Sequence, residues 1–286
     1  MTMQVRPLTD TLGAEIIGVD LAQPLDDVHK RELYRLFVDN AVVVFRDQHF
    51  TPQQFAAAAE IFGEIIPEQF PNYRLPEFPT VSFLSNSDLE KTGKKRAVRG
   101  EGFHTDHSNY EAPPKATILY GIDIPTSGGD TEFVSVQAAY DDLSAQTKQL
   151  IAGLRATHAY KSQRDQHKST VLSADALAKT PSARHPLARF NPDNGRLGLF
   201  VNPGRVTGID GMEEDAAFDL MDKLYAHATR GRHLYRHVWR KGDMVLWDNR
   251  SVLHQATTDY DMEERRYLYR VLLKGEVPLP APRQAA

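Results

Sequence analysis

The sequence predicts a mostly β protein in which a barrel or jelly roll is flanked by helices. Its second half consists mainly of short apolar and β-branched segments separated by long insertions, a pattern typical of barrels and jelly rolls. Apolar residues with helical spacing occur twice in the first third of the chain and in three places beyond it. The 286 residues contain no internal repeat and no dividing linker, so we expect a single domain over residues 1–286.

The first third of the chain alternates between strand and helix. Residues 12–19 are apolar and β-branched between turn residues, and residues 41–45 form a continuous apolar run, so both are expected to be strands. Asp26 is a suitable N-cap for the helix between them. Thr51, followed by Pro and then by Gln three residues on, predicts a capped second helix that ends at Gly63.

The region from residue 65 to residue 102 gives weaker signals. Four prolines between residues 67 and 79 exclude a regular helix, and residues 91–99 contain five Lys and Arg side chains. We favour a solvated loop for this region. The alternative is a mobile lid over a functional site, because long loops in compact domains often have such a role.

The remainder of the chain contains most strands of the expected barrel. They are predicted at residues 116–124, 131–135, 154–160, 197–202, 235–239, 244–247, 252–255 and 267–273. Helices are predicted at residues 136–143, 147–154 and 212–229. Residues 161–183 are polar and follow no regular period.

Composition excludes several classes of protein. The formal charge of −4 and the pI of about 6.3 indicate neither a nucleic-acid binder nor a membrane-surface binder. No apolar run approaches the roughly 18 residues of a membrane span, and the first residues lack the apolar segment of a secretory signal. The chain has no cysteine, which excludes a disulfide framework and a thiolate metal site. We therefore expect a cytoplasmic protein.

Common catalytic motifs are missing from the sequence. It contains no His-Glu-x-x-His, no phosphate-binding Gly-rich loop, no Gly-x-Gly-x-x-Gly and no Gly-x-Ser-x-Gly. It does contain His104-Thr105-Asp106, in which the two outer side chains would share one face of a strand and could bind one metal ion. With 11 histidines and 38 acidic residues such a pair also arises by chance, so a simple His–Asp hydrogen bond is an equally good interpretation.

Two arginines near the C-terminus strengthen the idea of a ligand site. In an extended segment Arg266 and Arg270 lie on the same face, and burying both would be costly without anions. Because a guanidinium binds carboxylates and similar groups through two hydrogen bonds, the pair predicts small anionic ligands. For the two arginines in isolation, ordinary surface charge beside Glu263 and Glu264 is the interpretation that we favour.

These residues, taken in their order along the chain, resemble the taurine / 2,4-dichlorophenoxyacetate dioxygenase family of Fe(II)- and 2-oxoglutarate-dependent oxygenases. The resemblance covers about Leu8 to Gly275. Each motif is weak alone, but the ordered set is specific. The motifs are Leu12-Gly13-Ala14-Glu15, Gly18-Val19-Asp20-Leu21, Phe45-Arg46-Asp47-Gln48, Phe62-Gly63, His104-Thr105-Asp106, Ser127-Gly128-Gly129-Asp130-Thr131, Trp247-Asp248-Asn249-Arg250, His254 and Arg266-Tyr267-Leu268-Tyr269-Arg270.

The resemblance implies a fold, a set of cofactors and a set of site residues. The fold would be a double-stranded β-helix, which is a jelly-roll or cupin-like core with flanking helices. Two histidines and one carboxylate are a known ligand set for non-haem Fe(II). By the same resemblance the protein would use 2-oxoglutarate and O2, release succinate and CO2, hydroxylate a C–H bond of a small anionic substrate, and form a homodimer or homotetramer. The implied metal ligands are His104, Asp106 and His254.

Further roles follow from the same resemblance. Thr131 and Arg266 would hold the far carboxylate of 2-oxoglutarate, and Arg270 would hold the anionic end of the substrate. The spacing from His254 is one residue longer than is usual in the family, so Arg265 is a rival to Arg266.

The residues expected around the substrate depart from those of taurine dioxygenases. Those enzymes carry a His and a Tyr shortly after the Phe-Gly pair and a Trp directly before the first ligand. This chain carries instead Glu68, Gln69, Phe70 and Tyr73 in the first region and Phe103 in the second. The departures argue against taurine as the substrate. Phe103 and His107, which follows Asp106, are expected near whatever substrate is used.

Two other functions remain open. The first is a metal-dependent hydrolase or isomerase on the same barrel, which would need no 2-oxoglutarate and would leave Thr131 and Arg266 without a role. The second is a binding protein without catalysis, which would usually have lost a metal ligand or an anion-binding residue. Because none is lost here, the oxygenase is the function that we favour.

Overall fold

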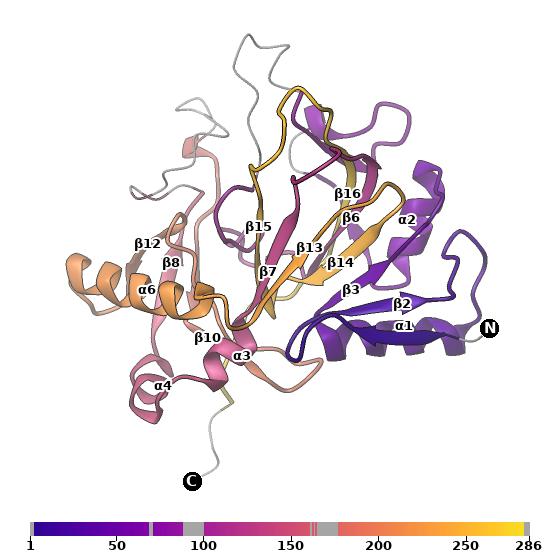
Figure 1. The fold of residues 1–286 in the computed structure, drawn as a ribbon. Helices are drawn as coiled ribbons and strands as arrows, with labels where there is room; N and C mark the ends of the chain where they lie inside the picture. The colour runs from indigo at the N-terminus through magenta and orange to yellow at the C-terminus, as the bar shows by residue number, and fades with distance from the viewer. Residues whose placement is uncertain are drawn as a thin grey trace.

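A jelly roll of two facing sheets, with helices packed outside it, forms the centre of the molecule (Figure 1). The computed structural model describes residues 3–68, 71–87, 100–160, 162, 164 and 177–282. The large sheet has eight strands. Its order is β1 (Gln4–Pro7), β2 (Ala14–Ile17), β3 (Val42–Phe45), β14 (Met244–Asp248), β6 (Ala116–Asp123), β16 (Tyr267–Leu273) and β4 (Ile65–Ile66), with β5 (Ser82–Ser85) also paired to β16.

The second sheet of the jelly roll is smaller and carries part of the site. Its strands are β13 (Leu234–His237), β7 (Thr131–Ser135) and β15 (Val252–Ala256). All pairings named so far are antiparallel except that of β2 with β3. Two further three-stranded sheets complete the described strands. They are β12 (Val206–Ile209), β8 (Arg155–His158) and β9 (Ala183–Pro186), and β11 (Leu197–Leu199), β10 (Ala188–Phe190) and β17 (Leu279–Pro280).

Helices cover both sides of the jelly roll (Figure 1). On one side α1 (Asp27–Asn40) and α2 (Pro52–Glu60) pack against the large sheet, and on the other α3 (Val136–Asp141), α4 (Ala145–Ile151) and α6 (Glu214–Thr229) pack around the smaller sheets. Both predicted caps are present, because Asp26 accepts from the backbone of His29 and Thr51 forms the predicted capping box. No helix in the described ranges is long and apolar enough to cross a bilayer.

The apolar run of β3 shows how the sequence builds two cores from one strand. Its alternate side chains point to opposite faces of the sheet. Val43 and Phe45 belong to the core beneath α1 and α2, whereas Val42 and Val44 belong to the core inside the jelly roll. In that inner core Val44 is joined by Phe133 and Trp247, from the small and the large sheet. All four residues of β3 are buried, as the continuous apolar run predicts.

The described parts of the region from residue 65 to residue 102 are more ordered than the solvated loop that we favoured. It contains β4, β5 and the short 3-10 helix at Pro71–Tyr73, and β5 pairs with β16 at the edge of the large sheet. The loop interpretation is therefore wrong for these parts. The basic stretch at residues 91–99 and most of the polar segment 161–183 lie outside the described residues.

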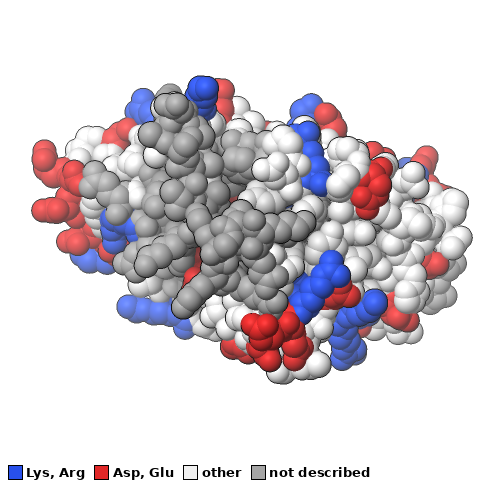
Figure 2. All heavy atoms as spheres, turned by 90° about the horizontal axis from the view of Figure 1, so that it is seen from above, with Lys and Arg blue, Asp and Glu red and all other residues white. Residues whose placement is uncertain are grey.

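Charged residues of both signs lie on the face of the molecule that Figure 2 shows. In the view of Figure 2, the Lys and Arg side chains that are drawn in blue are mixed with Asp and Glu side chains around the visible face. Among the described residues in this view, neither sign takes over the whole face. This mixture agrees with the small net charge of −4.

A buried charge network stabilises the turn that follows β14. Asp248 is fully buried and accepts hydrogen bonds from Arg250 Nε at 2.9 Å and from Asn191 Nδ2 at 3.0 Å. Arg250, also buried, reaches Asp193 at 2.6 Å. Desolvation lowers the pKa of Arg250, but the neighbouring carboxylates of Asp248 and Glu276 raise it more strongly, so its pKa is above its ordinary value.

Arg250→Ala is expected to lower the free energy of unfolding by ~3–5 kcal/mol, because it leaves the buried Asp248 carboxylate without its partner. The matched control is Arg196→Ala, which breaks an exposed pair with Asp141 and should cost ~0–1 kcal/mol. Urea unfolding followed by tryptophan fluorescence measures both values. Equal losses in the two variants would contradict a structural role for the buried network.

Candidate metal centre and its cavity

Two histidines far apart in the sequence are joined through their backbones. His254 is the third residue of β15, and the amide of His104 donates to its carbonyl at 3.0 Å. The amide of His254 donates back to the carbonyl of His104 at 2.9 Å, which makes an isolated antiparallel bridge. The bridge brings the two imidazole rings within 4.3 Å between centroids.

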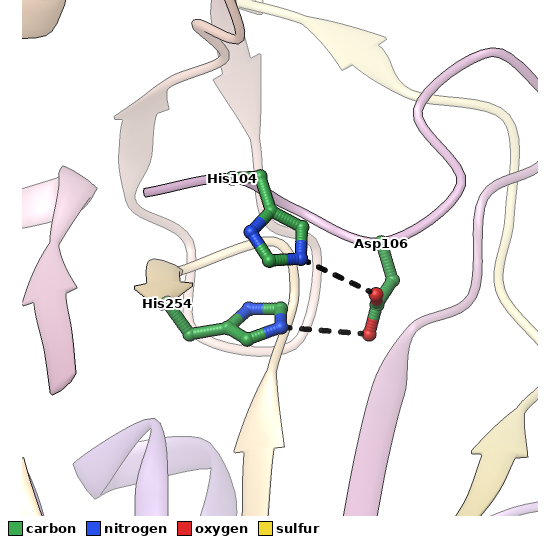
Figure 3. A group of neighbouring side chains, drawn as sticks. All are labelled: His104, Asp106 and His254. Atoms are coloured by element: carbon green, nitrogen blue, oxygen red, sulfur yellow. Dashed lines mark ion pairs between the residues drawn. The ribbon is translucent and has the colours of Figure 1, made fainter. Parts of the chain in front are cut away.

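Asp106 completes a group that can bind a metal ion. Its Oδ1 lies 3.9 Å from His104 Nε2, and its Oδ2 lies 3.8 Å from His254 Nε2 (Figure 3). The three potential ligand atoms are all within 4.8 Å of one another. We expected His104 and Asp106 to share one face of a strand, and this prediction is wrong in detail. Strand pairing is limited to the single bridge at His104, and Asp106 lies in the turn that follows.

The protonation of these side chains suits metal binding. His104 Nδ1 lies 2.8 Å from the carbonyl of Gly102, and because a carbonyl only accepts, Nδ1 is the donor and Nε2 faces Asp106. Burial, with repulsion from His104, lowers the pKa of His254 to about 3, so its ring is neutral at neutral pH. Burial raises the pKa of Asp106, but His254, His104 and Arg270 together lower it well below its usual range. The group thus offers imidazole nitrogens and one carboxylate.

A chain of side-chain hydrogen bonds fixes the orientation of Asp106. Thr117, on β6, donates from Oγ1 to Asp106 Oδ2 at 2.6 Å and accepts from Asn249 Nδ2 at 2.9 Å. Asn249 Oδ1 in turn accepts from the indole of Trp247 at 3.0 Å. The Trp247 ring also lies 4.6 Å from the ring of His254. Sequence reasoning missed Thr117, since a threonine within an apolar strand gives no signal of contact with a distant carboxylate.

The metal group opens into a cavity of about 180 Å³. Besides the three possible ligands, its walls include most of the residues that the sequence analysis singled out. They are Thr131, Arg266, Arg270 and His107. Further lining residues are Glu68, Tyr73, Leu84, Asn109, Tyr160 and Arg205. The structure therefore brings the predicted metal ligands and the predicted anion-binding residues together around one space.

Arg266 is a buried cation for which the described residues provide no acidic partner. Of the arginines buried in the described part of the chain, Arg189 and Arg250 form ion pairs, whereas no described carboxylate lies within ion-pair distance of Arg266. Its Nε donates to the carbonyl of Gly129 at 2.8 Å. Burial lowers its pKa to about 10, which still leaves it charged at neutral pH. A buried charge of this kind requires an anion.

The Gly128–Gly129 turn allows this approach. Gly129 has a φ of 67°, which disfavours L side chains, and a Cβ there would lie 3.3 Å from Arg266 Cδ. The turn leads directly into β7, where Thr131 accepts from the indole of Trp239 at 2.9 Å. Because the hydroxyl of Thr131 accepts from Trp239, its own proton can be donated toward the cavity.

The structure separates Arg265 from Arg266. The Arg265 side chain is 59% exposed, pairs with Asp123 at 2.8 Å and lies 4.5 Å from the centre of the Tyr267 ring. It does not line the cavity. Arg266 is therefore the one of the two that can meet a ligand there.

Arg270 differs from Arg266 because the chain supplies its anion. It forms an ion pair and hydrogen bond with Glu68, whose side chain is only 3% exposed. The Nε of Arg270 is buried without an acceptor among the described residues. The sequence analysis recorded Glu68 only as a departure from a family pattern. A single acidic residue among prolines gave no sign that it would meet an arginine about 200 residues later.

His107 and Phe103, which are the sequence neighbours of the possible metal ligands Asp106 and His104, differ in their surroundings. His107 lines the cavity, has a φ of 47°, and has a pKa lowered by burial. Phe103 is not among the described residues that line the cavity; it packs against the core formed by α3, α4 and α6 with the smaller sheets. A substrate contact for Phe103 is therefore not supported, because its ring is used in that core.

Comparisons with known proteins agree with this geometry. The model of the family "Taurine catabolism dioxygenase TauD, TfdA family" matches residues 4–272. The α-ketoglutarate-dependent 2,4-dichlorophenoxyacetate dioxygenase of Cupriavidus pinatubonensis is 31% identical over 94% of this chain and 97% of its own. The α-ketoglutarate-dependent sulfate ester dioxygenase of Pseudomonas putida is 31% identical, over 98% and 92%. A crystal structure of AAD-2 with Mn(II) and N-oxalylglycine superposes with a TM-score of 0.83 at 27% identity, over 99% and 100% of the two chains.

Thr117→Val is expected to weaken metal binding by about 10–100-fold, because it removes the hydrogen bond that orients Asp106 while keeping the side-chain volume. Anaerobic titration with Fe(II), or calorimetry with Mn(II), measures the dissociation constant without turnover. Thr207→Val is the control, since Thr207 is exposed and its hydroxyl donates to the backbone carbonyl of Thr157. Unchanged metal affinity in Thr117→Val would show that Asp106 needs no such support.

Proposed function

The chain belongs to the taurine catabolism dioxygenase TauD, TfdA family, and from that premise we propose that it is an Fe(II) enzyme that hydroxylates a C–H bond of a small organic anion. As a member it is a dioxygenase dependent on α-ketoglutarate, which is 2-oxoglutarate, and therefore an oxidoreductase. The proposal adds the metal, the use of O2 and the class of substrate. Succinate and CO2 would be the co-products from 2-oxoglutarate.

The observation that carries the proposal is the buried Arg266, which has no acidic partner among the described residues, in the cavity of His104, Asp106 and His254. A hydrolase or isomerase that needs no 2-oxoglutarate would leave this cation without an assigned role. A dicarboxylate that reaches both the metal and Arg266 explains it, because one carboxylate satisfies the guanidinium through two hydrogen bonds. The hydroxyl of Thr131, turned toward the cavity by Trp239, would donate to the same carboxylate.

The donor set fits Fe(II). Two imidazole nitrogens and one carboxylate on one side of an ion leave its other positions open, the arrangement found in non-haem Fe(II) oxygenases. An iron ion held by these three residues would supply open positions at which 2-oxoglutarate could chelate it and at which O2 could be activated. Thr117 would hold Asp106 in its ligating orientation throughout. The rings of Trp247 and Phe133 beside His254 would exclude water from that imidazole and keep it neutral.

The substrate would bind through its anionic group. Arg270 and Arg205 both line the cavity, and Arg270 lies near enough to Asp106 to lower its pKa. The named relatives act on 2,4-dichlorophenoxyacetate and on sulfate esters, which are anions. We therefore propose a sulfonate, sulfate ester, carboxylic acid or aryloxyalkanoic acid, whose anion is held by Arg270 while a C–H bond is presented to the metal side.

The first test of the proposal is spectroscopic. Anaerobic addition of Fe(II) and 2-oxoglutarate to metal-free protein is expected to produce the visible charge-transfer band of the chelate. His254→Ala should bind less iron and show no band, because it removes one of the three ligands. A protein that binds the metal but shows no band would favour the hydrolase or isomerase instead.

The second test concerns the anion-binding arginine. Arg266→Ala is expected to raise the 2-oxoglutarate concentration for half-saturation by about two to three orders of magnitude, in line with the ~3–5 kcal/mol lost when one half of a buried ion pair is removed. Arg265→Ala, which removes an exposed neighbour, is the matched control and should leave that concentration unchanged. The reverse outcome would assign 2-oxoglutarate to Arg265.

Arg270→Ala should weaken the binding of the substrate more than the binding of 2-oxoglutarate.

A further inference from the structure

The ion pair between Glu68 and Arg270 changes what the cavity can accept. Glu68 is almost fully buried and lies in the wall of the same cavity as the metal group. It comes from the segment that follows β4, whereas Arg270 lies in the middle of β16. The residue proposed to bind the substrate anion therefore already has a negative neighbour built into the protein.

Arg270 can still bind a further anion. A guanidinium has five N–H donors, and Glu68 uses only some of them. The Nε of Arg270 has no acceptor among the described residues, although it is buried. Arg205 adds a second cation to the walls of the cavity. The positive charge of this part of the site is therefore reduced by Glu68 but not removed.

A substrate anion bound at Arg270 would lie close to the carboxylate of Glu68. Two anions that share one buried arginine repel each other, and the repulsion is strong where water is excluded. A hydrogen-bond donor on the substrate, placed between the two anions, converts the repulsion into attraction, because the carboxylate accepts from it. A charge-assisted hydrogen bond of this kind is stronger than one between neutral groups.

We propose that Glu68 is a specificity-determining residue that makes the site select acids carrying an ammonium or hydroxyl group near the anion over plain anions of the same length. The inference rests on the proposed function, because it assumes that Arg270 binds the anion of the substrate. It narrows that function from small anions in general to amino or hydroxy acids. The aromatic ring of Tyr73 in the same cavity also suits an ammonium group, through cation–π contact, whereas the ring of Tyr160 already contacts the guanidinium of Arg205.

The test compares three matched ligands that differ only in their donor. They are 3-aminopropanesulfonate, 3-hydroxypropanesulfonate and propanesulfonate, with 4-aminobutanoate, 4-hydroxybutanoate and butanoate as a parallel carboxylate series. Dissociation constants are measured anaerobically by calorimetry on protein loaded with Fe(II) and 2-oxoglutarate. Because at least one donor-bearing acid gains a hydrogen bond to a buried carboxylate, it should bind about tenfold or more tightly than the plain anion.

Glu68→Gln is expected to abolish this preference or reverse it, because the amide removes the negative charge while keeping the shape. Glu68→Asp should retain part of the preference. Glu64→Gln is the matched control. Glu64 lies four residues before Glu68 and forms an exposed ion pair with Lys274, so this variant should behave as the unmodified protein. Thermal unfolding of each variant shows whether Glu68→Gln remains folded.

The outcomes separate this inference from the proposed function. A preference that is absent in the unmodified protein, or that persists in Glu68→Gln, overturns the role of Glu68, and so does failure of all six ligands to bind. The visible band of the chelate is recorded in the same samples. An intact band with no donor preference contradicts only the inference, whereas a missing band contradicts the proposed function itself. A difference between the ammonium and hydroxyl ligands identifies which donor Glu68 selects.

Discussion

Two backbone hydrogen bonds between His104 and His254 hold the functional site together. One histidine lies on the small sheet, and the other lies at the end of a long connection that contains residues outside the described ranges. Without the bridge, nothing in the local sequence around His104 would direct its ring toward β15. The same bridge determines where the turn with Asp106 begins, and therefore where the carboxylate meets Thr117 on the opposing large sheet. The metal group is thus assembled between the two sheets of the jelly roll.

The distribution of buried charge separates structural sites from ligand sites in this protein. At the turn after β14, the buried charges of Arg250 and Asp248 neutralise each other, so that this network needs no ligand. In the cavity, Arg266 is left without a carboxylate from the described chain, and Arg270 is only partly satisfied by Glu68. Since an isolated buried charge is unfavourable, a protein keeps one where a ligand completes it. The arginines therefore indicate where anions bind more clearly than the shape of the cavity does.

Much of the architecture was predictable because its signals are local. The apolar run of β3, the caps at Asp26 and Thr51 and the long helix α6 all depend on neighbouring residues, and all are present. The short strands β9, β10 and β12 were missed, because three or four residues are too few to show a period. The site followed the same rule. His104, Asp106, His254 and Arg266 could be proposed from ordered motifs, whereas Thr117 and Glu68 act through contacts with residues distant in sequence.

Two of the cavity arginines, Arg266 and Arg270, lie on a single stretch of chain, and this has a consequence for the geometry of the proposed reaction. Arg266 immediately precedes β16 and Arg270 lies within it, and an extended chain advances about 3.3 Å per residue, so their backbones are separated by roughly 13 Å. A strand paired on both sides does not stretch, and β16 pairs with β5 and β6. On the proposed function, β16 therefore fixes the distance between the carboxylate of the cosubstrate at Arg266 and the anion of the substrate at Arg270. On the proposed function, the carbon that is hydroxylated would be counted from the anionic end of the substrate, so that regioselectivity would follow chain length rather than the intrinsic strength of the C–H bond.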